Sequence, residues 1–432
     1  MTIQLRPYQL RANAEIREAM RAGHRRVLLV APTAFGKTAT ASEIMRSAVA
    51  KGRRVLFLVH RREIVNDTAR RLRAAGVPCG VLMAGVRTAG DPPVTVASIQ
   101  TVVARETFPR ADLVIWDEAH HAAAAQYVAV AAIYPAAHHL GLTATPERGD
   151  GVGLRDAFDA IILGATVREL QAEGYLAECD VLAPGTRIRG GLACEPAEAW
   201  RMYAEGRPTV AFCRSVDESI ALAEALGPRA RHVDGTTPLA TRAAILDDFA
   251  AGRIDVLTNV FVLTEGWDCS RAKVCLLARG IGHSGAYLQM VGRVLRRHGE
   301  ERALVIDLGG VLHDHGMPDE DRTYSLDGIT RAVPEKREWI SRCLACGTEV
   351  RGATRGEHCA VCKAPWPERE PVVITGAPLA KIAKVSRDEK VREFARLQEI
   401  ARLRGYKQGW VSHQYRARFG VWPVGVREKA DH

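Results

Sequence analysis

The sequence has no uninterrupted apolar run long enough to cross a bilayer, which takes about 20 residues. The alanine-rich stretch 122–137 is broken by Gln126 and Pro135. The first residues, Met-Thr-Ile-Gln-Leu-Arg, also lack the charged and apolar regions of a signal peptide. These absences argue against a membrane protein and predict a cytoplasmic protein with no membrane partner.

Cysteine is too sparse for a disulfide framework, since the chain has ten cysteines in 432 residues. Such frameworks are typical of small secreted domains. Cys213 and Cys275 lie inside apolar runs, where inert buried thiols are common. No residue constellation typical of a nuclease is found either.

What is present fits an ordinary globular protein, with 47% apolar and 25% charged residues and room for two or three domains. The formal charge of +10 is unevenly placed. Residues 331–432 hold 21 Lys and Arg against 12 Asp and Glu, which accounts for +9 of it. A basic tail on a nearly neutral body favours a polyanionic partner, most often nucleic acid. A merely solvated tail is the alternative.

Two sets of apolar runs alternate with helix-like stretches, which predicts two tandem α/β units with parallel sheets covered on both faces. The first set comprises 27–30, 55–59, 94–97, 113–116 and 139–142, and the second comprises 209–212, 256–258, 274–277 and 303–306. The expected helices include 62–75, 218–226, 241–251 and 286–297. Pro184, Gly185, Gly190 and Gly191 place the join between Ala177 and Pro196.

The segment 31–38, Ala-Pro-Thr-Ala-Phe-Gly-Lys-Thr, follows an apolar run and precedes a helix-like stretch. Strand, small-residue loop ending Gly-Lys-Thr and then helix is the context that a phosphate-binding loop requires. Lys37 is expected to reach the β- and γ-phosphates, and the Thr38 hydroxyl to hold Mg²⁺. Ala31 and Ala34 stand where glycines are usual, and alanine tolerates positive φ poorly. A chance loop is the alternative for the tripeptide alone.

Three further sites are candidates for chemistry. Asp117 and Glu118 close an apolar strand, where ligands bind in open α/β sheets, and are expected to hold Mg²⁺ and to activate water respectively. Thr143-Ala144-Thr145 ends the next strand, and from its spacing alone a small-residue turn is the preferred interpretation. Arg293 and Arg296, at i and i+3, are expected to share a helix face and bind the γ-phosphate. A solvated basic face is the alternative.

Together and in this order, these motifs resemble those of the superfamily-two helicases and translocases of the DEAH-box type, over about residues 3–310. The resemblance implies two RecA-like lobes with ATP between them. Further matches are Leu-Arg-Pro-Tyr-Gln at 5–9, His-Arg-Arg at 60–62, Ser-Ile-Gln-Thr at 98–101, Thr-Glu-Gly-Trp-Asp at 264–268 and Gln289 to Arg296. Within the superfamily, His-Arg-Arg-Glu, Thr-Glu-Gly-Trp-Asp and the cysteine cluster resemble the bacterial and phage RadD-like group, which implies DNA as substrate and a role in repair or recombination.

The resemblance also implies residue roles. The catalytic set is Lys37, Asp117, Glu118, Arg293 and Arg296. The nucleotide-binding set is Gln9, Thr33, Ala34, Phe35, Gly36, Lys37, Thr38, Gly266, Asp268 and Gln289, with Gln9 as the adenine contact. The strand-contacting set in the first lobe is His60, Arg61, Arg62, Gln100 and Thr101.

The C-terminal region carries a second metal signature. Two Cys-x-x-Cys pairs, twelve residues apart, have the spacing of a structural zinc site in which four thiolates close a tetrahedron. The ligands are Cys343, Cys346, Cys359 and Cys362. Surface thiols or iron in a rubredoxin-like site are the alternatives.

Beyond the cysteines, the stretch 386–404 is helix-like, and its apolar residues Phe394, Leu397, Ile400 and Leu403 are expected to pack on a lobe. Aromatic and basic residues then alternate, which fits either base stacking or the core of a helical hairpin. Lys407, Arg416 and Arg418 are the expected nucleic-acid contacts there.

The predicted protein is therefore an ATP- and Mg²⁺-dependent helicase or translocase that also binds Zn²⁺. Its expected domains are 1–176 and 177–330 for the two lobes, 335–370 for the zinc module and 380–432 for the basic tail. DNA is favoured over RNA, repair or single-strand-binding proteins are expected partners, and a monomer is expected. The alternatives are a nucleic-acid-stimulated ATPase switch that remodels or releases a partner without separating strands, and an RNA helicase.

Overall fold

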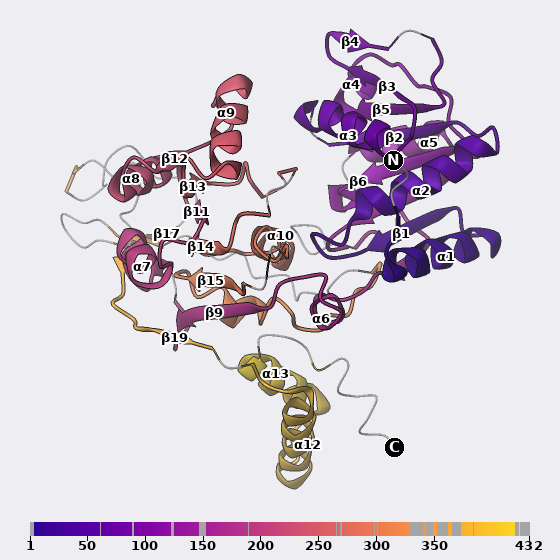
Figure 1. The fold of residues 1–432 in the computed structure, drawn as a ribbon. Helices are drawn as coiled ribbons and strands as arrows, with labels where there is room; N and C mark the ends of the chain where they lie inside the picture. The colour runs from indigo at the N-terminus through magenta and orange to yellow at the C-terminus, as the bar shows by residue number, and fades with distance from the viewer. Residues whose placement is uncertain are drawn as a thin grey trace. The chain divides into compact units, whose positions relative to one another are not determined.

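The structure is a computed structural model. It describes residues 4–60, 62–88, 90–121, 125–146, 153–188, 190–264, 266–267, 270–297, 299, 301–327, 340–342, 349–351, 362–364, 373–382, 384–419 and 423. The chain divides into two compact units, one formed by 1–329 with 374–432 and the other by 330–373. The larger unit contains two α/β lobes, each built on its own sheet (Figure 1).

The first lobe is built on an eight-stranded sheet of order β4-β3-β5-β2-β6-β7-β1-β8. Its strands are β1 (Arg26–Val30), β2 (Val55–Val59), β3 (Cys79–Met83), β4 (Val86–Arg87), β5 (Val94–Ser98), β6 (Leu113–Asp117), β7 (His138–Thr143) and β8 (Ala160–Leu163). The pairs are parallel except β3–β4. The carboxyl ends of β1, β2, β5, β6 and β7 therefore meet at one edge, where the predicted motifs follow them.

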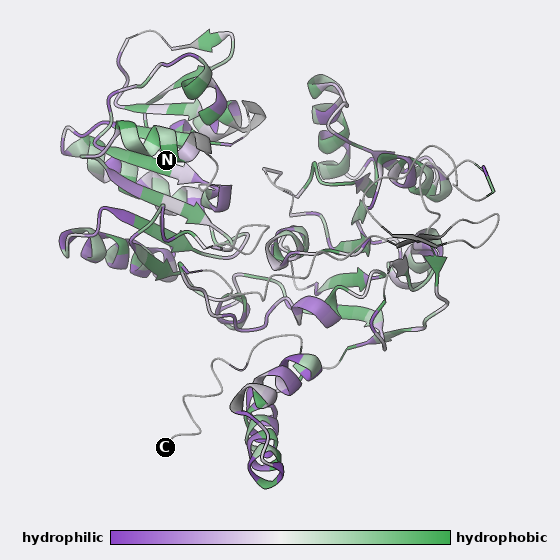
Figure 2. Ribbon diagram, turned by 180° about the vertical axis from the view of Figure 1, so that it is seen from behind, coloured by the Kyte–Doolittle hydropathy of each residue, from purple (hydrophilic) through white to green (hydrophobic). Residues whose placement is uncertain are grey.

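Successive side chains of a strand point to opposite faces of the sheet. Because these strands are apolar on both faces, helices cover both faces of the sheet. The helical segments are α1 (Pro7–Arg21), α2 (Lys37–Ala50), α3 (Arg62–Ala74), α4 (Ile99–Ala104), the 3₁₀ turn η1 (Ala119–His121), α5 (Ala125–Ile133) and α6 (Val167–Ala172). Val27 and Leu29 belong to one buried cluster, whereas Leu28 and Val30 belong to another. Figure 2 shows most of the strands in green, as expected for strands buried on both faces.

The second lobe repeats the plan with a seven-stranded sheet of order β12-β13-β11-β14-β15-β9-β19. Its strands are β9 (Cys179–Pro184), β11 (Thr209–Cys213), β12 (Ala230–His232), β13 (Val256–Asn259), β14 (Val274–Ala278), β15 (Ala303–Asp307) and β19 (Leu379–Lys381). Its helices are α7 (Pro196–Tyr203), α8 (Val216–Leu226), α9 (Leu239–Ala250), α10 (Ser284–Val291) and α11 (Leu312–His315). Only β19 runs antiparallel to its neighbour. The prediction of two parallel-sheet α/β domains is confirmed.

The predicted join of 177–196 overlaps the segment where the chain leaves the first sheet, but its glycines and prolines do not mark that segment. β9 already pairs with β15 of the second sheet, so the chain changes sheets between Leu163 and Cys179. Pro184 and Gly185 end a strand of the second lobe instead of marking the boundary. The short β10 (Gly191–Leu192) follows and pairs with β18 (Val373–Ile374).

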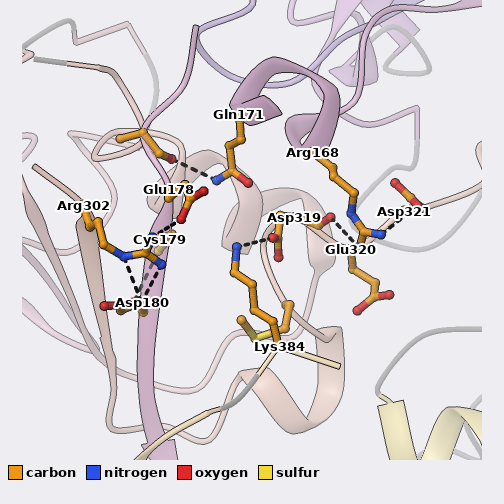
Figure 3. Close-up of polar contacts among 12 residues, drawn as sticks. Arg168, Gln171, Glu178, Cys179, Asp180, Arg302, Asp319, Glu320, Asp321 and Lys384 are labelled. Atoms are coloured by element: carbon orange, nitrogen blue, oxygen red, sulfur yellow. Dashed lines mark hydrogen bonds and ion pairs between the residues drawn. The ribbon is translucent and has the colours of Figure 1, made fainter. Parts of the chain in front are cut away.

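An acidic turn after β15 joins several parts of the larger unit (Figure 3). Arg168 of α6 lies 3.5 Å from the Asp321 carboxylate, and Lys384 lies 2.6 Å from that of Asp319. Lys390 pairs with Glu320, and both side chains are buried. A buried charge that keeps its partner avoids a cost of several kcal/mol. This turn therefore contacts a segment that precedes the second sheet and a segment that follows it.

The C-terminal residues form a helical hairpin of α12 (Arg387–Arg404) and α13 (Gln408–Phe419). The Ser386 hydroxyl caps α12 by accepting from the Glu389 N–H at 3.1 Å. Phe394 and Leu397 pack against Tyr415 of α13, not against a lobe as expected, and Leu403 is 69% exposed. Of the two interpretations of the aromatic residues, base stacking or the core of a helical hairpin, the second is correct for Tyr415.

Among the described residues of the smaller unit, β16 (Ile340–Arg342) pairs antiparallel with β17 (Glu349–Arg351). Cys343, Cys346 and Cys359 lie outside the described residues, and Cys362 is exposed. Across the described parts of the chain, no helix combines the length and apolar character that a bilayer crossing requires.

Candidate functional site

The loop between β1 and α2 has the geometry of a phosphate-binding loop. Gly36 takes φ 89° as the N-cap of α2, and Ala34 takes φ 71° two residues earlier. Ala34 thus occupies the left-handed region that disfavours a Cβ, at a cost of about 1–2 kcal/mol. A Cβ on Gly36 would lie 2.4 Å from the Gln9 amide nitrogen, so this position requires glycine.

Lys37 opens α2 and extends back along the loop, where its Nζ donates to the Ala31 carbonyl at 3.1 Å. Burial lowers the pKa of the Lys37 ammonium, and the nearby carboxylates of Glu118 and Asp117 act in the opposite direction. An ammonium with part of its hydration removed and two carboxylates nearby is placed to bind an incoming phosphate.

Asp117 ends β6 and Glu118 follows it with φ 49°, which is the left-handed region. Backbone strain of this kind collects at functional positions, where surrounding contacts hold it. The Glu118 carboxylate lies 3.5 Å from His120 Nδ1 and accepts from Gln289 Nε2 of α10 at 3.4 Å. Residues of both lobes therefore meet at Glu118.

The Thr143 hydroxyl contacts the Asp-Glu-Ala-His segment through His120 and not through the acidic pair. His120 Nδ1 lies 3.2 Å from Thr143 Oγ1, and that hydroxyl donates to the Thr145 carbonyl at 2.6 Å. Thr145 in turn lies against Gly285 of α10, whose added Cβ would be 2.6 Å from the Thr145 hydroxyl. Thr145 thus contacts the second lobe, whereas the spacing of the two threonines alone favoured a simple turn.

The expectation that Arg293 and Arg296 share a helix face is wrong, because α10 ends at Val291 and both arginines follow it. Arg293 is buried, and its guanidinium donates to the Thr264 carbonyl at 2.6 and 3.0 Å and to the Trp267 carbonyl. Arg296 forms a β-bridge with Leu176 through its backbone. Burial lowers the pKa of Arg296 to about 10, so its guanidinium remains charged at neutral pH.

A pocket of ≈ 910 Å³ brings these residues together. Of the predicted catalytic and nucleotide-binding residues, those lining it are Thr33, Ala34, Gly36, Lys37, Thr38, Asp117, Glu118, Gly266, Arg293 and Arg296. Both lobes supply them, and Gly292 approaches so closely that its added Cβ would lie 2.4 Å from Thr33 Cβ. Asp268 lies outside the described residues.

Gln9 and Phe35 are not among the residues that line this pocket, and the expected adenine contact of Gln9 stays a prediction. The Gln9 amide donates to the Phe35 carbonyl at 2.9 Å and accepts from the Arg6 N–H at 2.9 Å, so it holds the loop. The Phe35 ring is fully buried. Arg6 and Tyr175 line the pocket instead, with the guanidinium 4.7 Å from the ring centroid. Arg6 lies within the quoted motif, whereas nothing in the sequence pointed to Tyr175.

The predicted strand contacts of the first lobe are only partly brought together. Gln100 Nε2 donates to the His60 carbonyl at 2.5 Å, and the His60 ring stacks on His121 with centroids 4.2 Å apart. Thr101 is buried. Arg61 lies outside the described residues, as does the side chain of Arg62. In the tail, Lys407 is exposed, Arg416 is half-buried on α13, and Arg418 pairs with Glu393 at 2.6 Å.

Comparison with known proteins shows the family of the chain that carries this pocket. Residues 2–148 match the family described as type III restriction enzyme, res subunit, and 197–298 match the helicase conserved C-terminal domain. The chain is 28% identical over 362 residues to a Halobacterium salinarum protein named "Putative DNA 3'-5' helicase Rad25". The chain belongs to the superfamily-two helicases. This is a superfamily of ATP-hydrolysing enzymes.

One more sequence relative and one solved structure are similar to this helicase. It is 29% identical over 363 residues to the 51.5 kDa protein of a Lactococcus phage, covering 79% of this chain and 75% of the phage protein. The DNA-bound ATP-dependent Type ISP restriction-modification enzyme LlaBIII shares the fold, with a TM-score of 0.55, 17% identity, and coverage of 71% of this chain and 28% of the enzyme. The Rad25 match covers 76% of this chain and 58% of the archaeal protein, so the helicase spans little more than half of that relative.

Proposed function

We propose that this helicase hydrolyses ATP in the pocket between its lobes and uses the cycle to move along nucleic acid, with DNA preferred. The observation that carries the proposal is the composition of the pocket. Lys37, Thr38, Asp117 and Glu118 come from one lobe and Arg296 from the other, all around one cavity. A site completed only by both lobes links nucleotide state to their relative position.

The roles follow from the chemistry of each group. Backbone amides at the N-terminus of α2 and the Lys37 ammonium bind the phosphates. Glu118 accepts a proton from the attacking water, and Arg296 stabilises the charge that develops on the γ-phosphate. Arg293 positions the pocket wall through its carbonyl contacts.

The oxygen ligands that Mg²⁺ prefers are present in the same pocket, as the hydroxyl of Thr38 and the carboxylate of Asp117. These two residues would hold the ion, which neutralises phosphate charge when bound. Asp117 therefore has the role of a metal ligand, whereas the adjacent Glu118 has the role of the general base.

The coupling of hydrolysis to strand binding would run through the contacts around Glu118. Gln289 joins it to the second lobe, and His120 joins it to Thr143. The adjacent His121 stacks on His60, whose carbonyl accepts from Gln100. A change at the proposed strand contacts can therefore reach the proposed general base through neighbouring side chains.

DNA as the track is supported by the name of the archaeal relative, a putative DNA helicase, and by the basic C-terminal region. A role in repair or recombination, within the RadD-like group, rests on the motif details at 60–63 and 264–268 and on the cysteine cluster. The domain limits, the monomeric state and repair-protein partners expected from the sequence belong to this proposal.

Steady-state ATP hydrolysis tests the proposal, measured without nucleic acid and with single-stranded DNA, duplex DNA, forked DNA and RNA at low and moderate salt. We expect strong stimulation by DNA that weakens with salt, because phosphate contacts release counterions. Stimulation by RNA alone would make this an RNA helicase. Stimulated hydrolysis without strand displacement or tracking would identify an ATPase switch.

We also propose that Cys343, Cys346, Cys359 and Cys362 form a structural zinc site, on the strength of their spacing. The expected result is that Cys343→Ser loses zinc, because three thiolates and a hydroxyl hold the ion far less well than four thiolates. Metal content per protein chain measures this, with Cys194→Ser as a control outside the cluster. A Cys343→Ser protein that kept a full equivalent of zinc would contradict the four-thiolate site.

A further inference from the structure

An exposed aromatic ring in the second lobe has no role in the pocket described above. Phe261 follows β13 and is 46% exposed, although phenylalanine is among the residues most often fully buried. It is not part of the pocket lining or of either large buried cluster. A single exposed apolar side chain is common and marks no site by itself, so the groups around the ring decide what it can bind.

The surroundings of Phe261 are built in this way. The guanidinium carbon of Arg279 lies 4.0 Å from the ring centroid, so it covers one face of the ring. Arg279 is itself fixed, because its Nη1 donates to the Cys213 carbonyl at 3.1 Å and to the Val260 carbonyl at 3.3 Å. The exposed area of Phe261 must then come from its other face and its edge.

The position of Phe261 in the sheet adds to this. β12, β13, β11 and β14 are neighbouring parallel strands, so the residues after them line the same edge. Arg214 follows β11 and is held by Glu218 at 2.6 Å. After β12, the Asp234 carboxylate accepts from the hydroxyls of Thr236 and Thr237, both at 2.9 Å, which fixes that loop. The ring thus follows the strand that lies between β12 and β11, and the loops after both of those strands are fixed by their own side chains.

We propose that Phe261 is a stacking platform for an unpaired base, backed by Arg279, and that the second lobe therefore binds a single strand. This inference rests on the proposed function and specifies its track. A nucleobase stacks on an aromatic face whatever its identity, whereas a base within a duplex has both faces covered by its neighbours. Arg214, which follows the adjacent strand β11, carries a guanidinium of the kind that binds the phosphates of such a strand.

Fluorescence anisotropy tests this with three labelled ligands of equal length: an oligothymidylate strand, a strand of abasic sites and a blunt duplex. We expect Phe261→Ala to weaken binding of oligothymidylate by roughly 5- to 150-fold, the measured range for loss of one base–aromatic stack. Binding of the abasic strand and the duplex should stay within twofold, since neither offers an unpaired base. Phe261→Tyr should restore oligothymidylate binding.

The matched control is Phe108→Ala. Phe108 is a comparably exposed phenylalanine, at 38%, in the loop that enters the amino end of β6 in the other lobe. Equal loss on all three ligands, or no loss on any of them, would overturn the platform while leaving nucleic-acid binding intact. A wild-type protein that bound none of the three ligands would instead overturn the proposed function, and the platform with it.

Discussion

Glu118→Gln should leave ATP binding intact and lower turnover by about 10²- to 10⁴-fold, the usual contribution of a general base. The amide has the shape of the carboxylate and can still accept from Gln289, which lies 3.4 Å away in the native protein. It cannot accept a proton from water. The strained φ of 49° at this position is unchanged by the substitution, so the pocket keeps its form.

The measurement pairs steady-state hydrolysis with the affinity for a fluorescent nucleotide. Glu106→Gln is a close control, because Glu106 also has φ 49° and carries the same charge, but lies exposed after α4. It should hydrolyse ATP at the wild-type rate. Wild-type turnover in Glu118→Gln would remove Glu118 from the role of base and leave the positioning groups to account for catalysis.

The sequence was sufficient to predict the sheets and the motifs on them, because buried parallel strands are short continuous apolar runs whose ends collect the ligand-binding residues. Val55–Val59 is such a run and forms β2. The phosphate-binding loop was equally visible, since its function fixes both spacing and residue type. Even its departure from pattern was informative, because Ala34 does take the positive φ that a glycine would accept more easily.

Other features depend on contacts between residues far apart in sequence, and these could not be predicted. The end of α10 at Val291 is not signalled by a proline, and Arg293 leaves the helix to meet the Thr264 and Trp267 carbonyls. The Gln9 amide donates to the Phe35 carbonyl, a contact that its motif did not indicate. Phe261 was indistinguishable from a core phenylalanine, because only the fold shows that Arg279 covers one of its faces.

Arg296 and Arg293 were expected to act as a pair, but the structure predicts different outcomes for their loss. Arg296→Ala should lower turnover by about 10³- to 10⁵-fold, as removal of an arginine that stabilises the transition state of phosphoryl transfer does. Its pKa is lowered by burial to about 10, so the wild-type side chain is charged throughout the neutral range. The bridge with Leu176 should remain, because it is made by the backbone.

Arg293→Ala should instead destabilise the second lobe. The buried guanidinium satisfies the Thr264 and Trp267 carbonyls, and each buried acceptor left unpaired costs about 1–3 kcal/mol. Its thermal midpoint should fall, with lost activity following from lost structure. Arg297→Ala serves as the neutral comparison, since Arg297 lines the same pocket but is exposed and donates to the Gly174 carbonyl.

Thermal unfolding and steady-state hydrolysis on the three variants separate the roles. The expected pattern is a stable and inactive Arg296→Ala, an unstable Arg293→Ala and a stable Arg297→Ala with most of its activity. An active Arg296→Ala together with a stable, inactive Arg293→Ala would exchange the roles and make Arg293 the residue that contacts the γ-phosphate. Such an exchange would require the Arg293 guanidinium to leave the Thr264 carbonyl when ATP binds, so lobe closure would have to break these buried hydrogen bonds before hydrolysis.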